Sequence, residues 1–593
     1  MKPSFYHNKA LTTAQIDDGR AAPDELQWET AYPRPSLRRD DGTWKLLTDW
    51  TLTCVREDDD RHTPLGPIRM PFPPEAPLSG IGQTLEAGEV WLYETTFTLD
   101  APFIRRRTVL LHLPPTDQMC IVTLNGHEMT EDITAVLPSE YWIDEYLHPG
   151  ENHLTLRVRD DLNPDIPYGK QSAKRGGMWY TPTSGMHGMP WLESVPDDFI
   201  EELDVKPTKD SVTIMISGCE ELPKRLTWES EEGSHSLQFY GDSVTLHIPN
   251  PHLWSPDDPY VYRYTIEAGN DRVSSYFALR TVTRKTVNGR AVLCLNGKPH
   301  YFHGLLDQGY FPDGIDLPPR PDDYRAGILA AKSLGFDTLR KHIRVDDPYF
   351  YYYCDLCGML VFQDFVNSGH YSFLRDTVLP TIGFRRSIRR GLRHDIPVKQ
   401  CLNFLQIADD TLRHLRPHPC VVYYTIFNEG WGQHNADILY HRYRKGDPSR
   451  IWDTTSGWFF SQESDVQSEH VYFRRLQLRQ KMPAKRPLVL SEFGGYACKI
   501  DGHVFNTEKS YGYKTLSSPA ALTEALEKLY RDEVLPMIDR GLCVTIYTQI
   551  TDVEDEINGL FTYDRQVCKV DAEVMRKIAE DLRTAFIRTW SNV

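Results

Sequence analysis

The sequence predicts three domains: a jelly-roll β-sandwich over residues 1–198, an immunoglobulin-like β-sandwich over 199–285 and a (β/α)8 barrel over 286–593. Three observations support this fold class. A chain of 593 residues is too long for one hydrophobic core. Short alternating segments, separated by turn residues, fill the chain up to about residue 285. From there on, strand-like runs alternate with helical stretches, which is typical of a parallel barrel.

The first domain is predicted from short strands with alternating apolar and polar residues. Turn signals such as Asn125-Gly126 and Pro149-Gly150 separate them, and regular short strands of this kind indicate a sandwich or jelly roll. The strand-like segments are 91–100, 108–114, 119–126 and 153–160.

The second domain shows the same alternation over a span of roughly 85 residues, which fits an immunoglobulin-like sandwich. Its strand-like segments are 211–217, 243–249, 260–268 and 273–283.

The third domain contains eight strand candidates with helical segments between them, including residues 322–335 and 519–541. Eight such units in one domain describe a (β/α)8 barrel. The strand candidates are 301–307, 336–343, 360–365, 421–427, 450–457, 469–473, 487–494 and 543–550.

Two glutamates end apolar, β-branched runs and are each followed closely by glycine. VVYYTIFNEG carries Asn428 and Glu429 at the end of the fourth barrel strand, and RPLVLSEFGG carries Glu492 at the end of the seventh. The carboxyl ends of the strands meet at one rim of a barrel, so we expect both carboxylates to face one site. A carboxylate pair flanking a sugar is what glycoside hydrolysis requires. The alternative for Glu429 is a solvated glutamate that ends a strand.

Other side chains at strand ends predict the surroundings of this pair. Asn428 is suited to hydrogen-bond a sugar 2-hydroxyl. A nucleophilic Glu492 must be ionised, which requires hydrogen bonds or nearby cations. Tyr472, at the end of the sixth strand, is either a hydrogen-bond donor to Glu492 or an ordinary core tyrosine.

A basic cluster, Arg340, Lys341, His342 and Arg344, ends the second strand. An arginine here is suited to orient the nucleophile, which we assign to Arg340, and another cation to receive an acidic sugar. A surface ion-pair network is the alternative for at least two of the four. Asp364, at the end of the third strand, is expected either to bind a sugar hydroxyl or to pair with the basic cluster.

Composition and motifs exclude several classes of function. The formal net charge of −17 disfavours nucleic-acid and anionic-membrane partners. No zinc-protease, serine-hydrolase, Walker or dinucleotide motif is present, so we expect no metal and no cofactor. No apolar stretch is long enough to span a bilayer, the first residues lack the apolar core of a signal peptide, and the 11 cysteines are scattered. We therefore expect a cytoplasmic location. The carboxylate pair predicts a carbohydrate substrate as the partner, and the size of the chain is compatible with a homo-oligomer.

With these motifs in order, the chain resembles glycoside hydrolase family 2, which includes β-galactosidases, β-glucuronidases and β-mannosidases. The resemblance covers nearly the whole length. Its motifs are YPRP (32–35), PFPPEAPLSGI (71–81), SGMHGMPWLE (184–193), HLWSPDDPYVY (252–262), HGLLDQGYFPDG (303–314), FNEGWGQ (427–433), SEFGG (491–495) and TDVEDEINGLFTYDR (551–565).

The resemblance implies a retaining double displacement. By match to NEGWGQ, Glu429 takes the acid/base role, and by match to SEFGG, Glu492 takes the nucleophile role. Retention predicts carboxyl groups about 5–5.5 Å apart.

Several positions depart from the familiar members of the family. Trp179 stands where galactosidases and glucuronidases usually have an aspartate, and Tyr547 where they have a tryptophan, so the resemblance implies that both contact the substrate. The stretch 556–558 lacks the lysine of the glucuronidase Asn-x-Lys pair, and Asp307 begins a dipeptide that replaces the Arg-His of galactosidases. These departures disfavour a glucuronidase of the usual kind.

Two sugars remain as alternatives. One is a neutral sugar, galactose first, with Asp307, Asp364 and Trp179 shaping the site. The other is a uronic acid such as galacturonic acid, with its carboxylate met by Arg344 or His342. We expect a β-galactosidase-like enzyme, with the β-galacturonidase as the alternative. A non-catalytic carbohydrate-binding protein is disfavoured because both glutamates are present.

Overall fold

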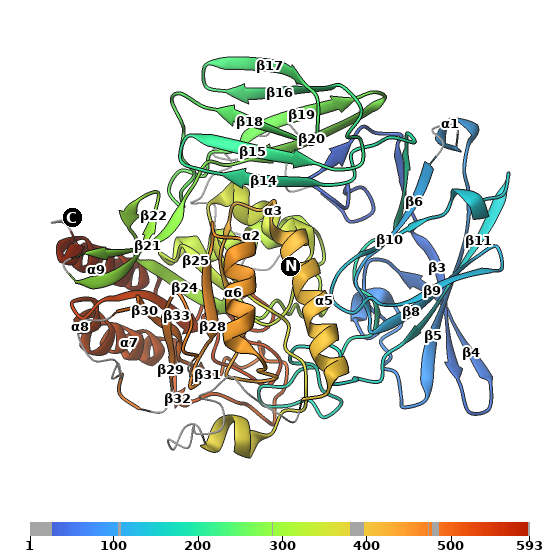
Figure 1. The fold of residues 1–593 in the computed structure, drawn as a ribbon. Helices are drawn as coiled ribbons and strands as arrows, with labels where there is room; N and C mark the ends of the chain where they lie inside the picture. Colours follow the sequence, from blue (N-terminus) through green and yellow to red (C-terminus); the bar gives the residue numbers. More distant parts are fainter. Residues whose placement is uncertain are drawn as a thin grey trace.

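The computed structural model describes residues 26–104, 108–287, 289–379, 396–459, 461–472, 474–476 and 485–590. Figure 1 shows two β-sandwiches, one blue on the right and one green at the top, beside a barrel coloured yellow to red. The predicted fold class is confirmed: β-sandwich domains accompany an eight-stranded parallel sheet curled like a TIM barrel.

The N-terminal sandwich has a six-stranded sheet of order β4-β3-β5-β11-β8-β9 and a four-stranded sheet of order β10-β6-β13-β2. The alternation that predicted these strands is seen in β11, whose residues are mostly exposed and buried alternately. Its buried residues Leu154 and Leu156 belong to the same core as Leu111 and Leu192 of the second sheet. The bounds are β2 Trp44–Leu46, β3 Asp49–Arg56, β4 Arg61–Arg69, β5 Glu89–Thr98, β6 Thr108–Leu113, β8 Met119–Leu124, β9 His127–Ile133, β10 Ser139–Trp142, β11 Glu151–Arg159 and β13 Trp191–Val195.

The second sandwich pairs a sheet of order β14-β15-β18 with a sheet of order β1-β20-β19-β16-β17 around a separate core. The strand β1 comes from the N-terminal region of the chain, so the two sandwiches share backbone pairing. The bounds are β1 Arg38–Arg39, β14 Leu203–Pro207, β15 Ser211–Ile216, β16 Lys224–Ser230, β17 Gly233–Phe239, β18 Ser243–His247, β19 Tyr262–Ala268 and β20 Asp271–Phe277.

A three-stranded sheet stands between the second sandwich and the barrel. It consists of β21 (Val282–Val287), β22 (Arg290–Leu295) and β23 (Lys298–Pro299). The domain boundary predicted between residues 285 and 286 therefore falls inside β21, because both flanking segments are β-strands and no change of periodicity marks the junction.

The barrel sheet has the order β28-β27-β26-β25-β24-β33-β30-β29, and the hydroxyl of Ser468 on β29 donates to Thr455 O on β28 at 3.1 Å across the seam. β27, β30 and β33 are buried along their whole length, as expected for strands covered on both faces. The strands are β24 Phe302–Asp307, β25 Thr338–Lys341, β26 Leu360–Asp364, β27 Val421–Phe427, β28 Ile451–Thr455, β29 Gln467–Val471, β30 Leu488–Gly494 and β33 Leu542–Thr548.

Helices surround this sheet (Figure 1). The helix expected over residues 519–541 is interrupted: α7 ends at Leu529 and a π-helical segment, Tyr530–Val534, leads into α8. The helix bounds are α2 Asp322–Ser333, α3 Pro348–Cys357, α5 Val398–Leu415, α6 Ala436–Gly446, α7 Pro519–Leu529, α8 Leu535–Ile538 and α9 Ala572–Trp590.

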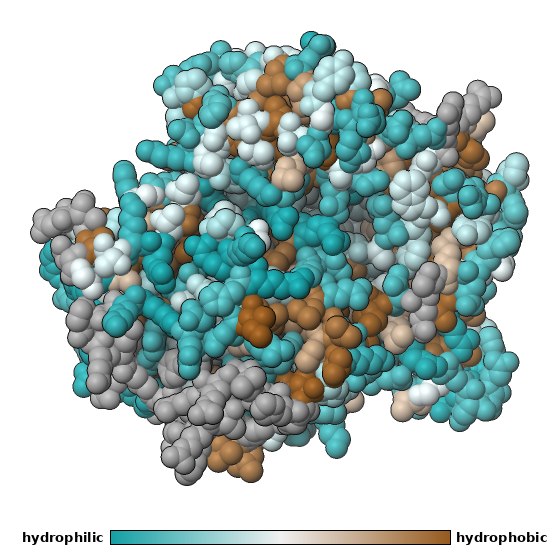
Figure 2. All heavy atoms as spheres, in the orientation of Figure 1, coloured by the Kyte–Doolittle hydropathy of each residue, from teal (hydrophilic) through white to brown (hydrophobic). Residues whose placement is uncertain are grey.

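The surface shown in Figure 2 is mostly hydrophilic, with apolar side chains gathered over the lower ends of α5 and α6. Exposed apolar residues on these helices are Val398, Leu402 and Ile438. No helix in the described part of the chain is both long and apolar enough to cross a bilayer.

Arg39 links the two sandwiches through buried ion pairs. Its guanidinium is 2% exposed and forms ion pairs with Glu193 of β13 at 2.9 Å and Asp271 of β20 at 3.0 Å. It also donates to Ile200 O at 2.6 Å. Its removal leaves two buried carboxylates with fewer partners, which costs more than the loss of a surface pair.

We predict that Arg39→Met lowers the free energy of unfolding by about 3–5 kcal/mol, because buried acids lose their cation. Arg38→Met is the matched control: the neighbouring Arg38 pairs with the exposed Asp41, and its loss should cost about 1 kcal/mol or less. Thermal and urea melts of both variants measure the difference. Equal melting temperatures would contradict a structural role for Arg39.

Candidate active site

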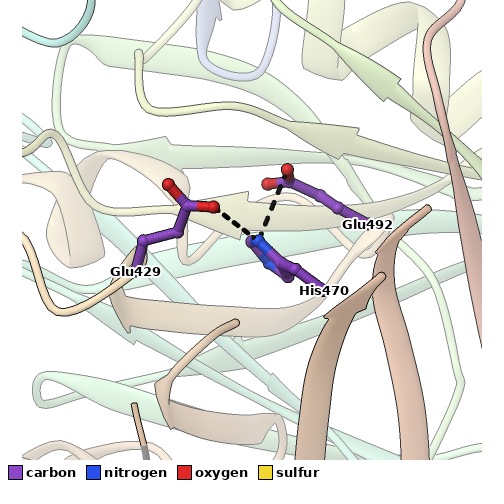
Figure 3. Close-up of side chains that lie close together, drawn as sticks. All are labelled: Glu429, His470 and Glu492. Carbon is purple, nitrogen blue, oxygen red and sulfur yellow. Dashed lines mark hydrogen bonds and ion pairs between the residues drawn. The ribbon is translucent and has the colours of Figure 1, made fainter. Parts of the chain in front are cut away.

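The two predicted glutamates meet at the carboxyl end of the barrel. Glu429 lies two residues after the end of β27, and Glu492 lies near the end of β30. One carboxylate oxygen of each, together with one ring nitrogen of His470, lies in a group whose atoms are all within 4.8 Å of one another. Figure 3 shows both carboxylates on the same side of His470, each joined to it by a contact. A separation this short suits direct attack by one carboxylate better than a pair with water between them.

Glu492 is held as an ionised carboxylate. Arg340 Nη1 donates to Oε1 at 2.8 Å, and the hydroxyl of Tyr472 donates to Oε2. Burial alone would raise the pKa of Glu492, but the nearby charges of His470 and Arg340 outweigh burial and lower it to about 2. An ionised, hydrogen-bonded carboxylate is the state that a nucleophile requires.

Arg340 organises the floor of the site. It is 1% exposed and donates to the carboxylate of Asp364, from Nε at 3.0 Å, and to Asn428 Oδ1, from Nη2 at 2.9 Å. It also donates to Ser491 O at 3.0 Å. One planar guanidinium therefore connects the ends of the second, third, fourth and seventh strands.

Glu429 lies in a different environment. Its backbone is in the left-handed region, with φ of 52°, and this turn aims its side chain across the strand end. His470 Nδ1 lies 2.9 Å from Glu429 Oε1 and 3.5 Å from Glu492 Oε2. No arginine or lysine among the described residues forms an ion pair with Glu429, so this carboxylate lacks the fixed cation that Glu492 has.

Gly457 makes room for this arrangement. A Cβ at Gly457 would lie 3.0 Å from His470 Nδ1 and 3.2 Å from Glu429 Cγ, and its φ of 82° disfavours any side chain. Glycine is therefore required here both by the backbone and by the close approach of the two functional side chains.

Asn428 is fixed with one end of its amide free for a ligand. Its Oδ1 accepts from Arg340 and from the Ser456 hydroxyl at 2.6 Å, which leaves Nδ2 as a donor directed away from both. Among the described residues Nδ2 has no hydrogen-bond partner. This geometry agrees with the predicted contact to a sugar hydroxyl.

Asp364 and His342 pair with each other beneath the site. His342 Nδ1 lies 2.8 Å from Asp364 Oδ2, and both residues are buried. Burial would raise the pKa of Asp364, but Arg340 and His342 hold it below its ordinary value. Of the two alternatives for Asp364, the structure favours pairing with the basic cluster over direct contact with a sugar.

Asp307 and Arg344 have strong partners within the protein. Asp307 accepts from Lys341 Nζ at 2.8 Å and from the Gly309 amide at 2.9 Å. Arg344 Nη1 donates to Asp316 at 2.8 Å. The charge of Arg344 is thus neutralised away from the two glutamates, so the structure does not support it as the cation that receives a sugar carboxylate.

Tyr547, predicted to contact substrate, instead points out of the barrel. It is 1% exposed, its ring packs edge-on to Phe493, and its hydroxyl accepts from the Tyr496 amide at 3.2 Å. The neighbouring Thr548 faces the site, with its hydroxyl 3.0 Å from that of Tyr472. Successive strand residues point to opposite faces, so an offset of one position moves the side chain from the site to the outer layer.

Trp179 reaches the barrel from the N-terminal sandwich. Its ring forms edge contacts with Tyr371 at 5.1 Å and Trp431 at 5.4 Å between centroids. Trp431 lies two residues after Glu429, so this aromatic cluster borders the turn that carries Glu429. The place of Trp179 agrees with its predicted role in shaping the site.

Further contacts dock the same segment onto the barrel. The Tyr180 hydroxyl donates to Glu556, and Gln308 donates to Tyr180. Glu554 accepts from the Thr181 amide at 2.9 Å. These contacts join residues more than a hundred positions apart, and no local pattern in the sequence predicted them.

Glu429, His470 and Glu492 also offer a set of atoms that a metal could use. The Arg340 guanidinium, 2.8 Å from Glu492, opposes a second cation there, and the Tyr472 hydroxyl already occupies the other oxygen of this carboxylate. The arrangement therefore fits acid/base and nucleophilic chemistry better than metal binding.

Comparisons with known proteins find similar sequences and structures among glycosidases. The profile described as "Glycosyl hydrolases family 2" matches residues 201–280, which form most of the second sandwich. The β-glucuronidase of Canis lupus familiaris is 23% identical over 454 residues, covering 68% of this chain and 66% of the relative. The β-galactosidase of Pectobacterium atrosepticum is 21% identical over 430 residues, covering 68% and 38%. The chain thus spans less than two thirds of either relative.

A solved structure agrees in fold over more of the chain. The β-galacturonidase from Eisenbergiella tayi bound to galacturonate has a TM-score of 0.66 at 14% identity, covering 94% of this chain and 99% of that one. The matched profile, the relatives and this fold make the chain similar to glycoside hydrolase family 2. Members of this family are glycoside hydrolases, which act on O-glycosyl bonds.

The residues predicted from strand ends and motifs mostly gather at one site. Asp307 and Arg344 pair with other charges of the fold, Tyr547 points out of the barrel, and Trp179 borders the turn that carries Glu429. His470 was quoted within a strand but not singled out, although its place one residue before the end of β29 is the same kind of signal that identified the glutamates. The residues brought together are Arg340, His342, Asp364, Asn428, Glu429, Tyr472 and Glu492.

We predict that Gly457→Ala lowers kcat by about 100-fold or more with intact fold, because the added methyl group displaces His470 or Glu429. Gly502→Ala is the matched control, since Gly502 has the same φ of 82° and nothing within 4 Å of the added Cβ. Steady-state kinetics and thermal melts compare the two. A normal kcat in Gly457→Ala would contradict the close packing described here.

We predict that Tyr472→Phe moves the acid limb of the kcat/KM profile upward by about one pH unit, because losing one donor raises the pKa of Glu492 from its lowered value. The nucleophile must be ionised, so activity is then lost at a higher pH as the solution is acidified. Activity near neutrality should also fall about 10–100-fold. An unchanged acid limb in a correctly folded variant would show that the hydroxyl does not stabilise the ionised carboxylate.

Proposed function

We propose that this protein is a retaining exo-β-glycosidase that removes a terminal sugar by double displacement. The observation that carries this proposal is the carboxylate pair within 4.8 Å, with Glu492 bound to Arg340 and Tyr472 while Glu429 has neither partner. Two carboxylates in such different environments suit opposite roles.

In the first step Glu492 attacks the anomeric carbon while Glu429 protonates the departing oxygen. In the second step Glu429 takes a proton from water, which displaces the sugar from Glu492. His470, in contact with both carboxylates, keeps Glu429 in position as it gains and loses this proton. The free Nδ2 of Asn428 is placed to bind the sugar 2-hydroxyl, where the hydrogen bond strengthens in the transition state.

For the terminal sugar we propose a uronic acid, and this replaces the neutral sugar favoured by the sequence. The dog relative is named a β-glucuronidase, and the Eisenbergiella tayi structure is that of a β-galacturonidase. A neutral hexose such as galactose is the second candidate. It is supported by Glu556, whose buried carboxylate lies in the stretch where glucuronidases carry a lysine, and by the relative named a β-galactosidase.

We predict that Glu492→Gln lowers kcat on nitrophenyl glycosides by about 10⁴-fold or more, because a neutral amide cannot form the glycosyl-enzyme. Glu429→Gln should retain the first step on substrates with good leaving groups and show a burst, since only the second step needs the base. Glu508→Gln, an exposed glutamate, serves as the control.

The panel for these variants contains 4-nitrophenyl β-glucuronide, β-galacturonide and β-galactoside. Proton NMR of the first product formed should show the β-anomer, as retention requires. An α-anomer, or full activity in Glu492→Gln, would refute the double displacement.

A further inference from the structure

Lys170 belongs to a segment of the N-terminal sandwich domain that crosses the carboxyl end of the barrel. The amides of Tyr168 and Gly169 donate to Asn367 O at 3.0 and 3.3 Å, and the Tyr168 hydroxyl donates to Gly369 O at 2.9 Å. A Cβ on Gly169 would lie 2.9 Å from Ile343 O. The segment is therefore held tightly between the residues that follow β25 and those that follow β26.

The side chain of Lys170 borders a cavity at this junction. The cavity has a volume of about 690 Å³ and is lined by residues of both sandwiches and the barrel, among them Gln308, Tyr310 and His342. Glu429 and Glu492 are not among its lining residues, but His342 is, and His342 shares Asp364 with Arg340 at the floor of the site.

Several other basic side chains that the structure describes at the carboxyl end of the barrel are matched by acids. Arg340 pairs with Asp364 and Glu492, and His342 shares Asp364. Further pairs of this kind are Lys341 with Asp307 and Asp346, Arg344 with Asp316 and Asp346, and Arg175 with Glu554.

Lys170 differs from these cations. In the described part of the chain its ammonium has no carboxylate within 4.0 Å and no hydrogen bond; its recorded contact is with the Tyr180 ring, 5.9 Å from the centroid. It is half-buried. Burial is the main cause that lowers the pKa of His342, and the charge of Lys170 lowers it further; the same charge is among those that lower the pKa of Glu492.

We propose that Lys170 is the residue that recognises the substrate's carboxylate, binding the acid group of a terminal uronic acid in the site of Glu429 and Glu492. This inference rests on the proposed function and specifies its substrate class. A half-buried ammonium with no acid partner among the described residues is available for a charged hydrogen bond with an anionic ligand. Because the segment is pinned at Tyr168 and Gly169, the charge is held in place before the sugar arrives.

The placement also explains how the chain can act on a uronide although the stretch 556–558 has no lysine. The cation comes from another domain. Glu556 accepts hydrogen bonds from Tyr180 and Asn558, and the Lys170 ammonium lies near the ring of Tyr180.

The test compares Lys170→Met with Lys170→Arg and with Lys174→Met, an exposed lysine on the same loop, in the full-length protein. The measured quantity is kcat/KM on 4-nitrophenyl β-glucuronide and β-galacturonide, divided by kcat/KM on the β-galactoside. We expect this ratio to fall about 30-fold or more in Lys170→Met, largely through KM, because a charged hydrogen bond to the sugar is lost. Lys170→Arg should restore most of it, and Lys174→Met should match the wild type.

Three results would overturn the inference. The first is an equal loss of kcat/KM on acidic and neutral substrates in Lys170→Met, which would mean that Lys170 acts through the charge of Glu492. The others are no loss of kcat/KM in that variant, or a wild-type preference for the galactoside. If the wild type cleaves no glycoside, the proposed function fails, and calorimetric titration with free galacturonate and glucuronate still decides the role of Lys170. Binding that is lost in Lys170→Met supports it, and binding that is absent from the wild type or unaltered by the substitution refutes it.

Discussion

The site depends on one buried guanidinium. Arg340 binds the nucleophile candidate Glu492, the carboxylate of Asp364 and the amide oxygen of Asn428, and it is almost wholly excluded from solvent. A buried cation is stable only where carboxylates and carbonyl groups surround it. Because Arg340 needs these partners, the ends of four strands lie close together around its guanidinium. The same hydrogen bonds fix the orientation of Glu492 and Asn428.

Charge is distributed unequally over the two glutamates. Glu492 has a fixed cation and a phenol as donors, while the partner of Glu429 is the ring of His470. The two carboxylates have oxygens within 4.8 Å of one another but different surroundings. The proposed division into nucleophile and acid/base thus follows from their surroundings and not from their residue type.

The N-terminal sandwich contributes to the site as well as to stability. Trp179, Tyr180 and Lys170 come from a segment that follows its β11 strand and lies across the end of the barrel. The barrel supplies the reaction geometry, and the added segment supplies an aromatic wall and an uncommitted charge. This arrangement allows substrate choice to vary without disturbing Arg340 and its partners.

Much of this could be predicted from the sequence because the signals are local. Alternation identified the sandwiches, apolar runs identified the eight barrel strands, and the strand ends identified Glu429, Glu492, Asn428, Tyr472 and Arg340. The features that the sequence did not predict depend on an offset of a single residue or on contacts between distant parts of the chain. Tyr547 was placed on the wrong face because strand side chains alternate, and β1 joined the second sandwich through pairing with residues more than two hundred positions away.

The sequence by itself determined the fold class and predicted a carboxylate pair at one rim of the barrel, since strand periodicity and strand-end carboxylates are properties of short segments. Only the tertiary structure decided which charges have partners. Arg344, His342 and Lys170 are all basic side chains in the sequence, but in the described part of the chain the first two lie beside acids and Lys170 does not. Whether a charge is available for a ligand depends on partners brought close by folding, and no local pattern contains that information.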